Sequence, residues 1–288
     1  MIDASQELIE LLDLERLELN LFRGVGTGGE TSTRIFGGHV IAQALASGYK
    51  TVEHRICHSL HAYFVRPGDP MIPVVYQVDR TRDGSSFNTR RVVAMQNGKQ
   101  ILTMSASFHI TEDGWEHQHL MPKVKGPEGL PERAVLRATV ADQFEEKKRK
   151  EFTRMRPIEI REVAPRDFFD PEPTSDINHM WFRVPAAKNT NPVMQQCLLA
   201  YASDLNLLGS AFRPHGITLF KGEIMTASLD HAMWFHAPVQ FEDWHLYSMD
   251  SPFSGGARGF NRGSVFDRKG KLVASVAQEG LMRKFKSK

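Results

Sequence analysis

The chain has 288 residues, of which 41% are hydrophobic and 24% charged, and its formal net charge is +2. A chain of this length forms one large domain or two domains of about 100–150 residues each. The composition is typical of a soluble globular protein, and the small net charge argues against nucleic acid or an anionic membrane surface as a partner.

The cysteines, the apolar runs and the first residues together predict a cytoplasmic protein without a membrane span. Cys57 and Cys197 both lie in apolar segments, which is typical of buried, reduced thiols and not of a disulfide framework. No apolar run reaches the roughly 18 residues that a membrane-spanning helix requires. The opening Met-Ile-Asp-Ala-Ser-Gln-Glu is too polar and acidic for a signal or transit peptide.

Residues 1–111 are predicted to form one unit, in which helices precede an antiparallel sheet. An amphipathic helix is expected over residues 5–19 and an apolar helix over residues 39–50. Gly37 and Gly38 precede the apolar helix, and they favour either a tight turn or a helix start whose amides approach a phosphate or a carbonyl oxygen. Strands bounded by turn signals are expected at residues 58–65, 72–79, 87–96 and 100–109.

Residues 112–179 differ in composition from the segments on either side, because they are rich in Pro, Glu, Lys and Arg. The mixed-sign run Glu145-Glu-Lys-Lys-Arg-Lys-Glu is typical of a solvated helix face and not of a nucleic-acid site. Strands are expected at residues 158–163 and 180–184. The segment is therefore interpreted as a charged connector that includes the first strands of a second half.

The plan of the first half recurs in residues 180–288. The apolar helix expected over residues 195–208 is followed by a strand expected over residues 228–235. A His-Ala pair occurs in corresponding strands, at His61 and at His231. The first helix carries no acid in the middle, so the first half is expected to be a scaffold and the second half to carry the chemistry.

Two pairs of landmarks support a duplication. The offset from Pro67 to Pro238, where corresponding strands end, matches the offset from Gly98 to Gly270 to within one residue. We therefore expect a duplicated unit of a helix wrapped by antiparallel sheet. Two such half-sheets leave a cleft between them.

One carboxylate interrupts the second apolar helix. If the helix is continuous, Asp204 shares a face with Cys197, Tyr201 and Leu208 and has apolar or aromatic groups on both sides. A buried charge there costs several kcal/mol unless it is paired or hydrogen-bonded. Asp204 is therefore either a structural acid that accepts backbone hydrogen bonds or a catalytic carboxylate.

Familiar catalytic and cofactor motifs are missing from the sequence. It contains no Gly-x-Ser-x-Gly elbow, no P-loop and no Gly-x-Gly-x-x-Gly after a strand. Its 12 histidines form no His-Glu-x-x-His helix, so we expect neither a metal nor a cofactor. Ser228 and Gln278 each lie in an otherwise apolar strand. Each alone is a weak indication, but with Asp204 they would form a polar cluster in an apolar cleft.

Several blocks spread over most of the chain match a known pattern. They are Ile35-Phe-Gly-Gly-His-Val, His58-Ser-Leu-His-Ala-Tyr-Phe-Val-Arg-Pro-Gly-Asp, Arg82-Asp-Gly-Ser-Ser-Phe, Ser203-Asp-Leu-Asn, Ser228-Leu-Asp-His-Ala-Met-Trp-Phe-His and Ala277-Gln-Glu-Gly. From about Leu11 to Arg283 the chain resembles the acyl-CoA thioesterase II family, the TesB-type enzymes. The resemblance implies an α+β double hotdog, in which two tandem helix-wrapped antiparallel sheets form one continuous sheet. It also implies hydrolysis of fatty acyl-CoA to free acid and CoA.

The same resemblance implies the site residues. The family's Asp on the second hotdog helix, its Thr or Ser on the following strand and its Gln near the C-terminus correspond to Asp204, Ser228 and Gln278. A thioester carbonyl is already activated, so water can attack it directly. Asp204 would take the proton of that water, with a pKa raised by apolar neighbours, and the other two would hold the water. A backbone amide near a helix start is expected as the oxyanion donor.

Two alternative functions remain open at this point. Asp204-Leu-Asn206 resembles the Gly-Asp-x-Asn-Pro-x-His block of enoyl-CoA hydratases, but Leu207 and Gly209 stand at the Pro and His positions, so the second acid/base group is missing. A non-catalytic acyl-CoA sensor would need the cleft without the trio. Because hotdog sheets pair along their edges, a homodimer or homotetramer is expected, with acyl-CoA as the other partner.

Overall fold

The computed structural model describes residues 3–26 and 34–285. The first half contains α1 (Ala4–Leu12), β1 (Glu15–Glu18), β2 (Leu21–Gly24), α2 (Gly37–Tyr49), β3 (Ile56–Phe64), β4 (Val74–Asp83), β5 (Phe87–Gln96) and β6 (Lys99–His109). The connecting region contains α3 (Arg133–Val140), α4 (Glu146–Thr153) and β7 (Glu159–Glu162). The second half contains β8 (Asn178–Arg183), α5 (Pro192–Ser203), α6 (Gly209–Phe212), β9 (Ile224–Ser228), β10 (Asp230–Phe235), β11 (His245–Gly255), β12 (Arg258–Phe266) and β13 (Leu272–Lys284). Short 3₁₀ turns lie at η1 (Pro127–Gly129), η2 (Ala141–Gln143), η3 (Pro185–Ala187) and η4 (Arg213–His215).

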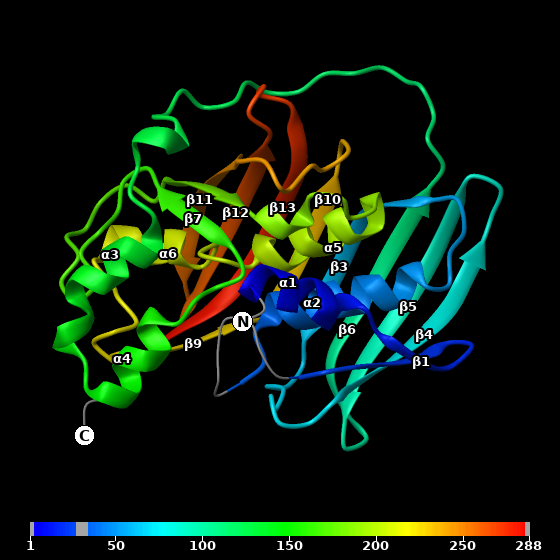
Figure 1. Cartoon of the computed structure of the whole chain (residues 1–288), viewed down its shortest axis with the longest axis horizontal. Coiled ribbons are helices and arrows are strands. Elements are labelled where there is room, and N and C mark those ends of the chain that lie inside the picture. Colours follow the sequence, from blue (N-terminus) through cyan, green and yellow to red (C-terminus); the bar gives the residue numbers. More distant parts are fainter. Residues whose placement is uncertain (1–2, 27–33, 286–288) are drawn as a thin grey trace.

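The described strands form one 13-stranded sheet in the order β1-β2-β4-β5-β6-β3-β10-β13-β12-β11-β8-β7, with β9 paired to β13. The central pair, β3 and β10, is antiparallel, with Asp230 opposite Tyr63 and Trp234 opposite Ser59. The strands on either side of this pair follow matching orders. The prediction of two tandem antiparallel sheets joined in one continuous sheet is therefore confirmed (Figure 1).

Helices α2 and α5 pack together against one face of the sheet (Figure 1). They run antiparallel, because Phe36 at the start of α2 packs edge-on against Tyr201 near the end of α5, with ring centroids 5.1 Å apart. At the other end of the pair, the Tyr49 hydroxyl donates to Gln196 of α5. Both helices are buried along almost their whole length, so they form the core between the two halves.

The N-terminal helix is shorter than predicted. It ends at Leu12, and residues 15–18 form strand β1 instead of continuing the helix to residue 19. Asp13 caps the helix with an extended backbone, which turns the chain toward the sheet edge. The leucine spacing identified the buried face, since Leu8 and Leu12 are both buried, but it did not identify where that face ends.

The apolar helix of the second half also ends earlier than predicted. Helix α5 stops at Ser203, and Asp204 is its C-cap, not a residue of the helix interior. Two residues later, Asn206 adopts a left-handed backbone with φ of 62°, which breaks the helix before Leu208. The predicted common face of Asp204 and Leu208 therefore does not exist.

The two cysteines are buried and form no disulfide, as predicted. Burial raises the pKa of the Cys197 thiol to about 12, which keeps it protonated near neutral pH. No helix in residues 3–26 and 34–285 has both the length and the apolar character to cross a membrane. Within the same residues, no group of three or more His, Cys, Asp or Glu side chains is arranged to hold a metal ion.

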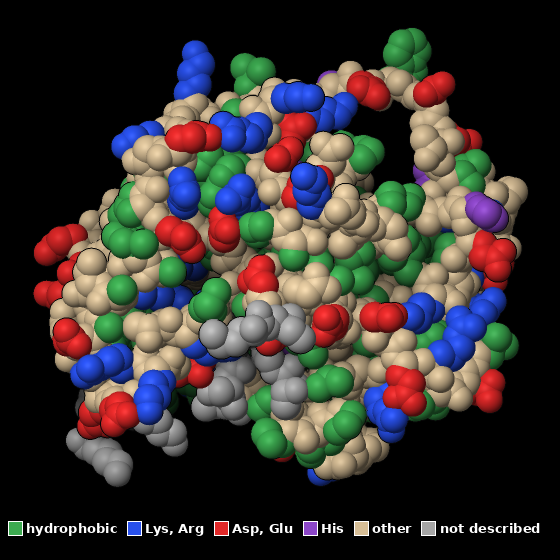
Figure 2. Space-filling model, viewed as in Figure 1, with side chains coloured by type: hydrophobic (Ala, Val, Ile, Leu, Met, Phe, Trp, Pro, Cys, Tyr) green, Lys and Arg blue, Asp and Glu red, His purple; other side chains and the backbone are tan. Residues whose placement is uncertain are grey.

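Charged side chains of both signs are interspersed on the face shown in Figure 2. The run at residues 145–151 forms most of α4, where Lys150 and Glu146 make an exposed ion pair of 2.7 Å, so the prediction of a solvated helix face is confirmed. Between β6 and η1 the connector arches away from the sheet (Figures 1 and 2). Trp115 and Leu120 on this arch are almost fully exposed.

Candidate active site

A cavity of about 710 Å³ lies where the start of α2 meets the end of α5. Its walls come from both halves of the chain, with Phe36 and Phe64 from the first half and Phe212 from the second. Asp204 and Ser228 line this cavity, and so does Gln278. The structure thus brings together the three side chains that were predicted to form the polar cluster.

Asp204 accepts hydrogen bonds from two directions. The backbone amide of Gly38 donates to its Oδ2 atom at 3.0 Å, and the Ser228 hydroxyl donates to its Oδ1 atom over a longer 3.4 Å. Ser228 ends β9, because Leu229 separates it from β10. The strand predicted over residues 228–235 is therefore two strands, and the Ser228 side chain lies at the break between them.

The two glycines that begin α2, Gly37 and Gly38, are required by this close approach. A Cβ atom on Gly37 would lie 2.6 Å from Asp204 Oδ2, and one on Gly38 would lie 2.2 Å from the Tyr201 carbonyl oxygen. Both distances are shorter than real contacts, so a larger residue at Gly37 would displace the Asp204 carboxylate, and one at Gly38 would push the helices apart. Of the two sequence interpretations, the helix start that approaches an acceptor is correct, but the acceptor is a carboxylate.

The environment of Asp204 favours its neutral form overall. Burial raises the pKa of its carboxyl above the ordinary value, and this effect outweighs the opposing contributions of His231, Gln278, the Gly38 amide and Ser228. The N-terminus of α2 stabilises the ionised form, because the first amides of a helix carry partial positive charge. The predicted direction of the pKa shift is confirmed.

His231 was not recognised as a site residue from the sequence. It is fully buried on β10, where its Nδ1 atom contacts Gln278 Oε1 and its Nε2 atom lies 2.9 Å from the Ser203 hydroxyl. The Gln278 Nε2 group donates in turn to Ser228 Oγ at 3.1 Å. A chain of four hydrogen bonds therefore connects the last residue of α5 to Asp204.

The proton positions in this chain follow from its chemistry. Burial lowers the pKa of His231, so the ring is neutral near pH 7 and carries one N–H. Because Gln278 uses its NH₂ group on Ser228, its carbonyl oxygen must accept the His231 Nδ1–H. His231 Nε2 is then an acceptor, so the single proton of the Ser203 hydroxyl is shared between that nitrogen at 2.9 Å and the Ala200 carbonyl oxygen at 2.8 Å. The Ser228 proton is left to point at Asp204.

The His-Ala repeat in the sequence was the signal that could have found His231. However, the paired strands place Ala232 opposite His61, so the two histidines of the repeat face opposite sides of the sheet. His61 is exposed and contacts Trp234, whereas His231 is buried. The repeat identified two equivalent sequences but not the one-residue shift that sends a single histidine to the core.

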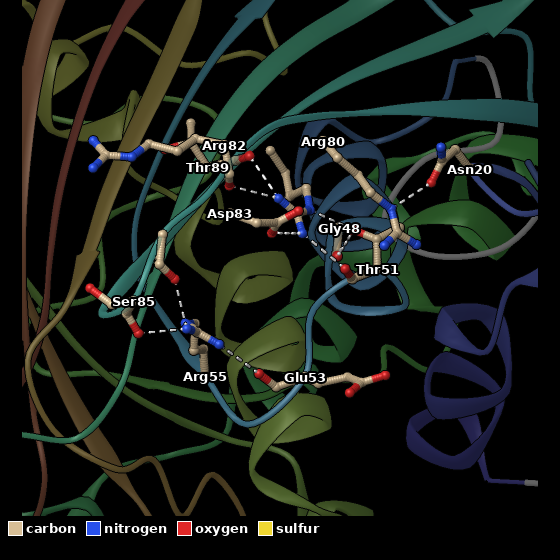
Figure 3. A network of polar contacts seen from close by, with 12 residues as sticks. Asn20, Gly48, Thr51, Glu53, Arg55, Arg80, Arg82, Asp83, Ser85 and Thr89 are labelled. Carbon is tan, nitrogen blue, oxygen red and sulfur yellow. Dashed lines mark hydrogen bonds and ion pairs between the residues drawn. The ribbon is translucent and has the colours of Figure 1, made fainter.

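The corresponding end of α2 has a structural network in place of an acid. The C-cap there is Lys50, and the nearby Arg90 side chain is 1% exposed. Arg90 donates to Thr51 Oγ1 at 2.8 Å and to the Thr51 carbonyl at 3.0 Å, and it forms an ion pair with Asp83. Figure 3 shows the places of Thr51 and Asp83 in this network. These contacts fasten the end of α2 to the hairpin of β4 and β5 and leave no carboxylate equivalent to Asp204.

Two family models match the chain. Residues 147–281 match a model described as acyl-CoA thioesterase, and residues 28–109 match an acyl-CoA thioesterase N-terminal domain. Acyl-CoA thioesterase 2 of Haemophilus influenzae is 36% identical over 284 residues, which cover 98% of this chain and 99% of that protein. This relative spans nearly the whole of the fold described above, whereas the two models leave residues 110–146 unmatched.

Solved structures agree with this assignment. An acyl-CoA thioesterase II, TesB2, from Mycobacterium marinum is 39% identical and superposes with a TM-score of 0.78, covering 98% of this chain and 99% of that one. A hot dog fold protein from Alicyclobacillus acidocaldarius, 18% identical with a TM-score of 0.76 and coverage of 97% and 99%, supports the fold alone. The double hotdog expectation is thereby confirmed. The chain belongs to the TesB-type acyl-CoA thioesterase II family, a family of thioester hydrolases.

Proposed function

We propose that this protein hydrolyses fatty acyl-CoA thioesters to free fatty acid and CoA by direct attack of water, with Asp204 as the general base. The observation that carries this proposal is the pairing of Asp204 with the Ser228 hydroxyl in the wall of a cavity large enough for an acyl chain. Family membership supports the class of reaction.

In the proposed reaction, Asp204 accepts a proton from the water while the water oxygen bonds to the thioester carbonyl carbon. The tetrahedral intermediate then collapses, the C–S bond breaks, and the CoA thiolate takes the proton back from Asp204. Ser228 donates to Asp204 and accepts from Gln278, so both side chains fix the direction of the carboxylate lone pairs. No covalent acyl-enzyme is needed.

Positioning and charge stabilisation come from two further parts of the structure. His231 holds the Gln278 amide in one orientation, because its single N–H can only meet the amide oxygen. In the first turn of α2, the Gly38 amide donates to Asp204, and the amides of His39 and Val40 donate to the Phe36 carbonyl. We propose the remaining amide, that of Gly37 beside Asp204, as the donor to the developing oxyanion.

The cavity favours hydrolysis over the alternative of water addition to a double bond. The second acid/base group of the hydratase motif is a histidine, and no histidine is among the described residues that line the cavity. Gly209, at the position where the hydratase motif has its histidine, is one of the lining residues and has no side chain to offer.

The test is a thiol-release assay over a series of acyl-CoA chain lengths, with the free acid identified by mass spectrometry. We expect equal amounts of CoA and fatty acid. A sensor would bind the same thioesters with no release of thiol, and a hydratase would convert 2-enoyl-CoA to its hydroxyacyl product with the thioester intact. Either of these results would contradict the proposal.

A further inference from the structure

The cavity wall contains two guanidinium groups that the proposed reaction does not use. Arg213 lies in η4 and is 8% exposed, and Arg166 lies half-buried in the loop after β7. Both line the same cavity as Asp204. Burial and the charge of Arg213 lower the pKa of the Arg166 guanidinium, because the two cations lie close enough to repel each other.

Neither guanidinium forms an ion pair with a residue in the described part of the chain. Arg213 Nε donates to the Ser175 carbonyl at 3.0 Å, and Arg166 Nη2 reaches the Glu172 carbonyl at 3.4 Å. The Arg166 Nε atom is buried without a hydrogen-bond partner among the described residues. Arginines that are withdrawn from water are normally paired, so the buried Arg213 and the half-buried Arg166 are suited to bind an anion that the chain itself does not supply.

Three acidic side chains of this region interact with other groups. Glu162, whose charge acts on both arginines, is ion-paired with Arg133 at 2.6 Å. Asp176 accepts the Ser251 amide at 3.0 Å, and the exposed Asp167 accepts two amides of its own loop at 2.7 Å. None of these carboxylates forms a hydrogen bond or ion pair with Arg166 or Arg213 in the described part of the chain, so guanidinium donors remain available at this end of the cavity.

We propose that Arg166 and Arg213 form a subsite that binds an anionic oxygen group of the thioester substrate. The inference rests on the proposed function, because it assumes that the cavity takes a thioester. Guanidinium groups bind phosphates and carboxylates through charge-assisted hydrogen bonds. The anion is either a phosphate of the CoA part or a carboxylate at the far end of the acyl chain.

The experiment compares three thioesters of one acyl length: the acyl-CoA, the acyl-pantetheine without phosphates, and the acyl-CoA with a terminal carboxylate on the acyl chain. The variants are Arg213→Met, Arg166→Met and Arg213→Lys, with Arg91→Met as the control. Arg91 is exposed on β5 and does not line the cavity. If Arg213→Met does not fold, Arg166→Met, which removes a more exposed side chain, carries the test.

For a phosphate, we expect KM for acyl-CoA to rise about 10- to 100-fold in the Met variants, with a much smaller change for acyl-pantetheine. For a carboxylate, kcat/KM should fall by the same factor only for the carboxylated acyl-CoA. Arg213→Lys should recover part of the loss in either case. Equal kinetics of the Met variants and the unsubstituted protein, or an equal loss on all three thioesters, would overturn the subsite.

Failure of the subsite is distinguishable from failure of the proposed function. If the unsubstituted protein cleaves none of the thioesters, the proposed function is wrong. The subsite is then tested by calorimetric binding of CoA and of the carboxylated acyl-CoA, which should weaken about 10-fold or more in Arg166→Met for at least one of them. Unchanged binding of both would overturn the subsite independently.

Discussion

The backbone amide of Gly38 lies 3.0 Å from the Oδ2 atom of Asp204, so the first turn of one central helix donates to the acid that ends the other. This contact joins the two halves of the chain at the site. It also explains why the acid can lie on an apolar helix pair, because the helix N-terminus compensates part of the cost of burying its charge.

The contact predicts that Gly38→Ala damages the protein strongly. The added methyl would lie 2.2 Å from the Tyr201 carbonyl, so α2 and α5 must separate and Asp204 loses its amide donor. We expect a loss of about 2–4 kcal/mol in the free energy of unfolding and a loss of most hydrolysis. Chemical denaturation and thiol release measure the two effects.

Gly48→Ala at the other end of α2 is the matched control. A Cβ there would meet its nearest neighbour, the Phe108 ring, at 3.4 Å, which is an ordinary contact. Because Ala favours the helix over Gly by about 1 kcal/mol, this variant should keep its activity and its stability. If Gly38→Ala and Gly48→Ala had the same free energy of unfolding and the same rate of thiol release, the proposed role of the contact between α2 and α5 would be wrong.

His231→Phe should lower kcat without a matching change in KM. The substitution removes the N–H that orients the Gln278 amide, so the amide can turn and present its oxygen to Ser228. Since the contacts of the ring with Gln278 and with Ser203 are both lost from a buried network, we expect kcat to fall about 10- to 100-fold. Steady-state kinetics over several acyl-CoA concentrations separate kcat from KM.

The control for this prediction is His61→Phe, the other histidine of the His-Ala repeat. It is exposed and has a ring contact with Trp234 that Phe can replace. His231→Asn adds a second check, because its amide can donate as the Nδ1–H does, and it should retain more activity than His231→Phe. A KM effect alone in His231→Phe would exclude the positioning role.

Ser228→Thr should keep activity within about threefold, whereas Ser228→Ala should lose about 10-fold or more, because only the hydroxyl donates to Asp204. The two substitutions change the volume in opposite directions, so a packing effect would not give this order. The thiol-release assay decides between the outcomes. Comparable activity of Ser228→Ala and the unsubstituted protein would remove Ser228 from the mechanism.

The pH dependence follows from the raised pKa of Asp204. Hydrolysis requires the ionised carboxylate, so kcat/KM should fall about tenfold per pH unit on the acid side, with a midpoint above the ordinary 3.8 of an aspartic acid. Stability runs in the opposite sense. Because the folded pKa is the higher one, the stabilising contribution of this group is complete below the unfolded pKa and is lost as pH rises through the folded pKa.

It follows that Asp204→Asn should be more stable than the unsubstituted protein near neutral pH and not at acid pH. Thermal unfolding across this pH range measures the difference. A constant difference at every pH would show that the carboxyl is not titrating within the folded protein as described.

Sequence patterns predicted the central parts of the fold because these depend on local chemistry. The two apolar helices, the alternating strands and the repeat follow from side-chain period and turn residues, and the resemblance supplied Asp204, Ser228 and Gln278. Strands β11 and β12 were not predicted, although both lie in the second half of the sheet. The cytoplasmic location and the homo-oligomer remain predictions.

The features of the site that the sequence did not predict depend on tertiary contacts. The end of α5 at Ser203 depends on the left-handed Asn206, and the inward direction of His231 depends on strand register with β3. The pairing of Gly38 with Asp204 joins residues 166 positions apart, which no local pattern encodes. The cavity arginines likewise come from separate segments, Arg166 from the loop after β7 and Arg213 from η4, which only the fold brings together.

The most direct test of the central role of Asp204 is the hydrolysis rate of Asp204→Asn, measured by thiol release beside the binding of a non-hydrolysable acyl-CoA analogue. Asp230→Asn is the control, since that acid lies near the site on β10 but not in the cavity wall. We predict a loss in kcat of about 10²–10⁴-fold for Asp204→Asn with the analogue's Kd nearly unchanged. Hydrolysis at the unsubstituted rate by Asp204→Asn would contradict the mechanism.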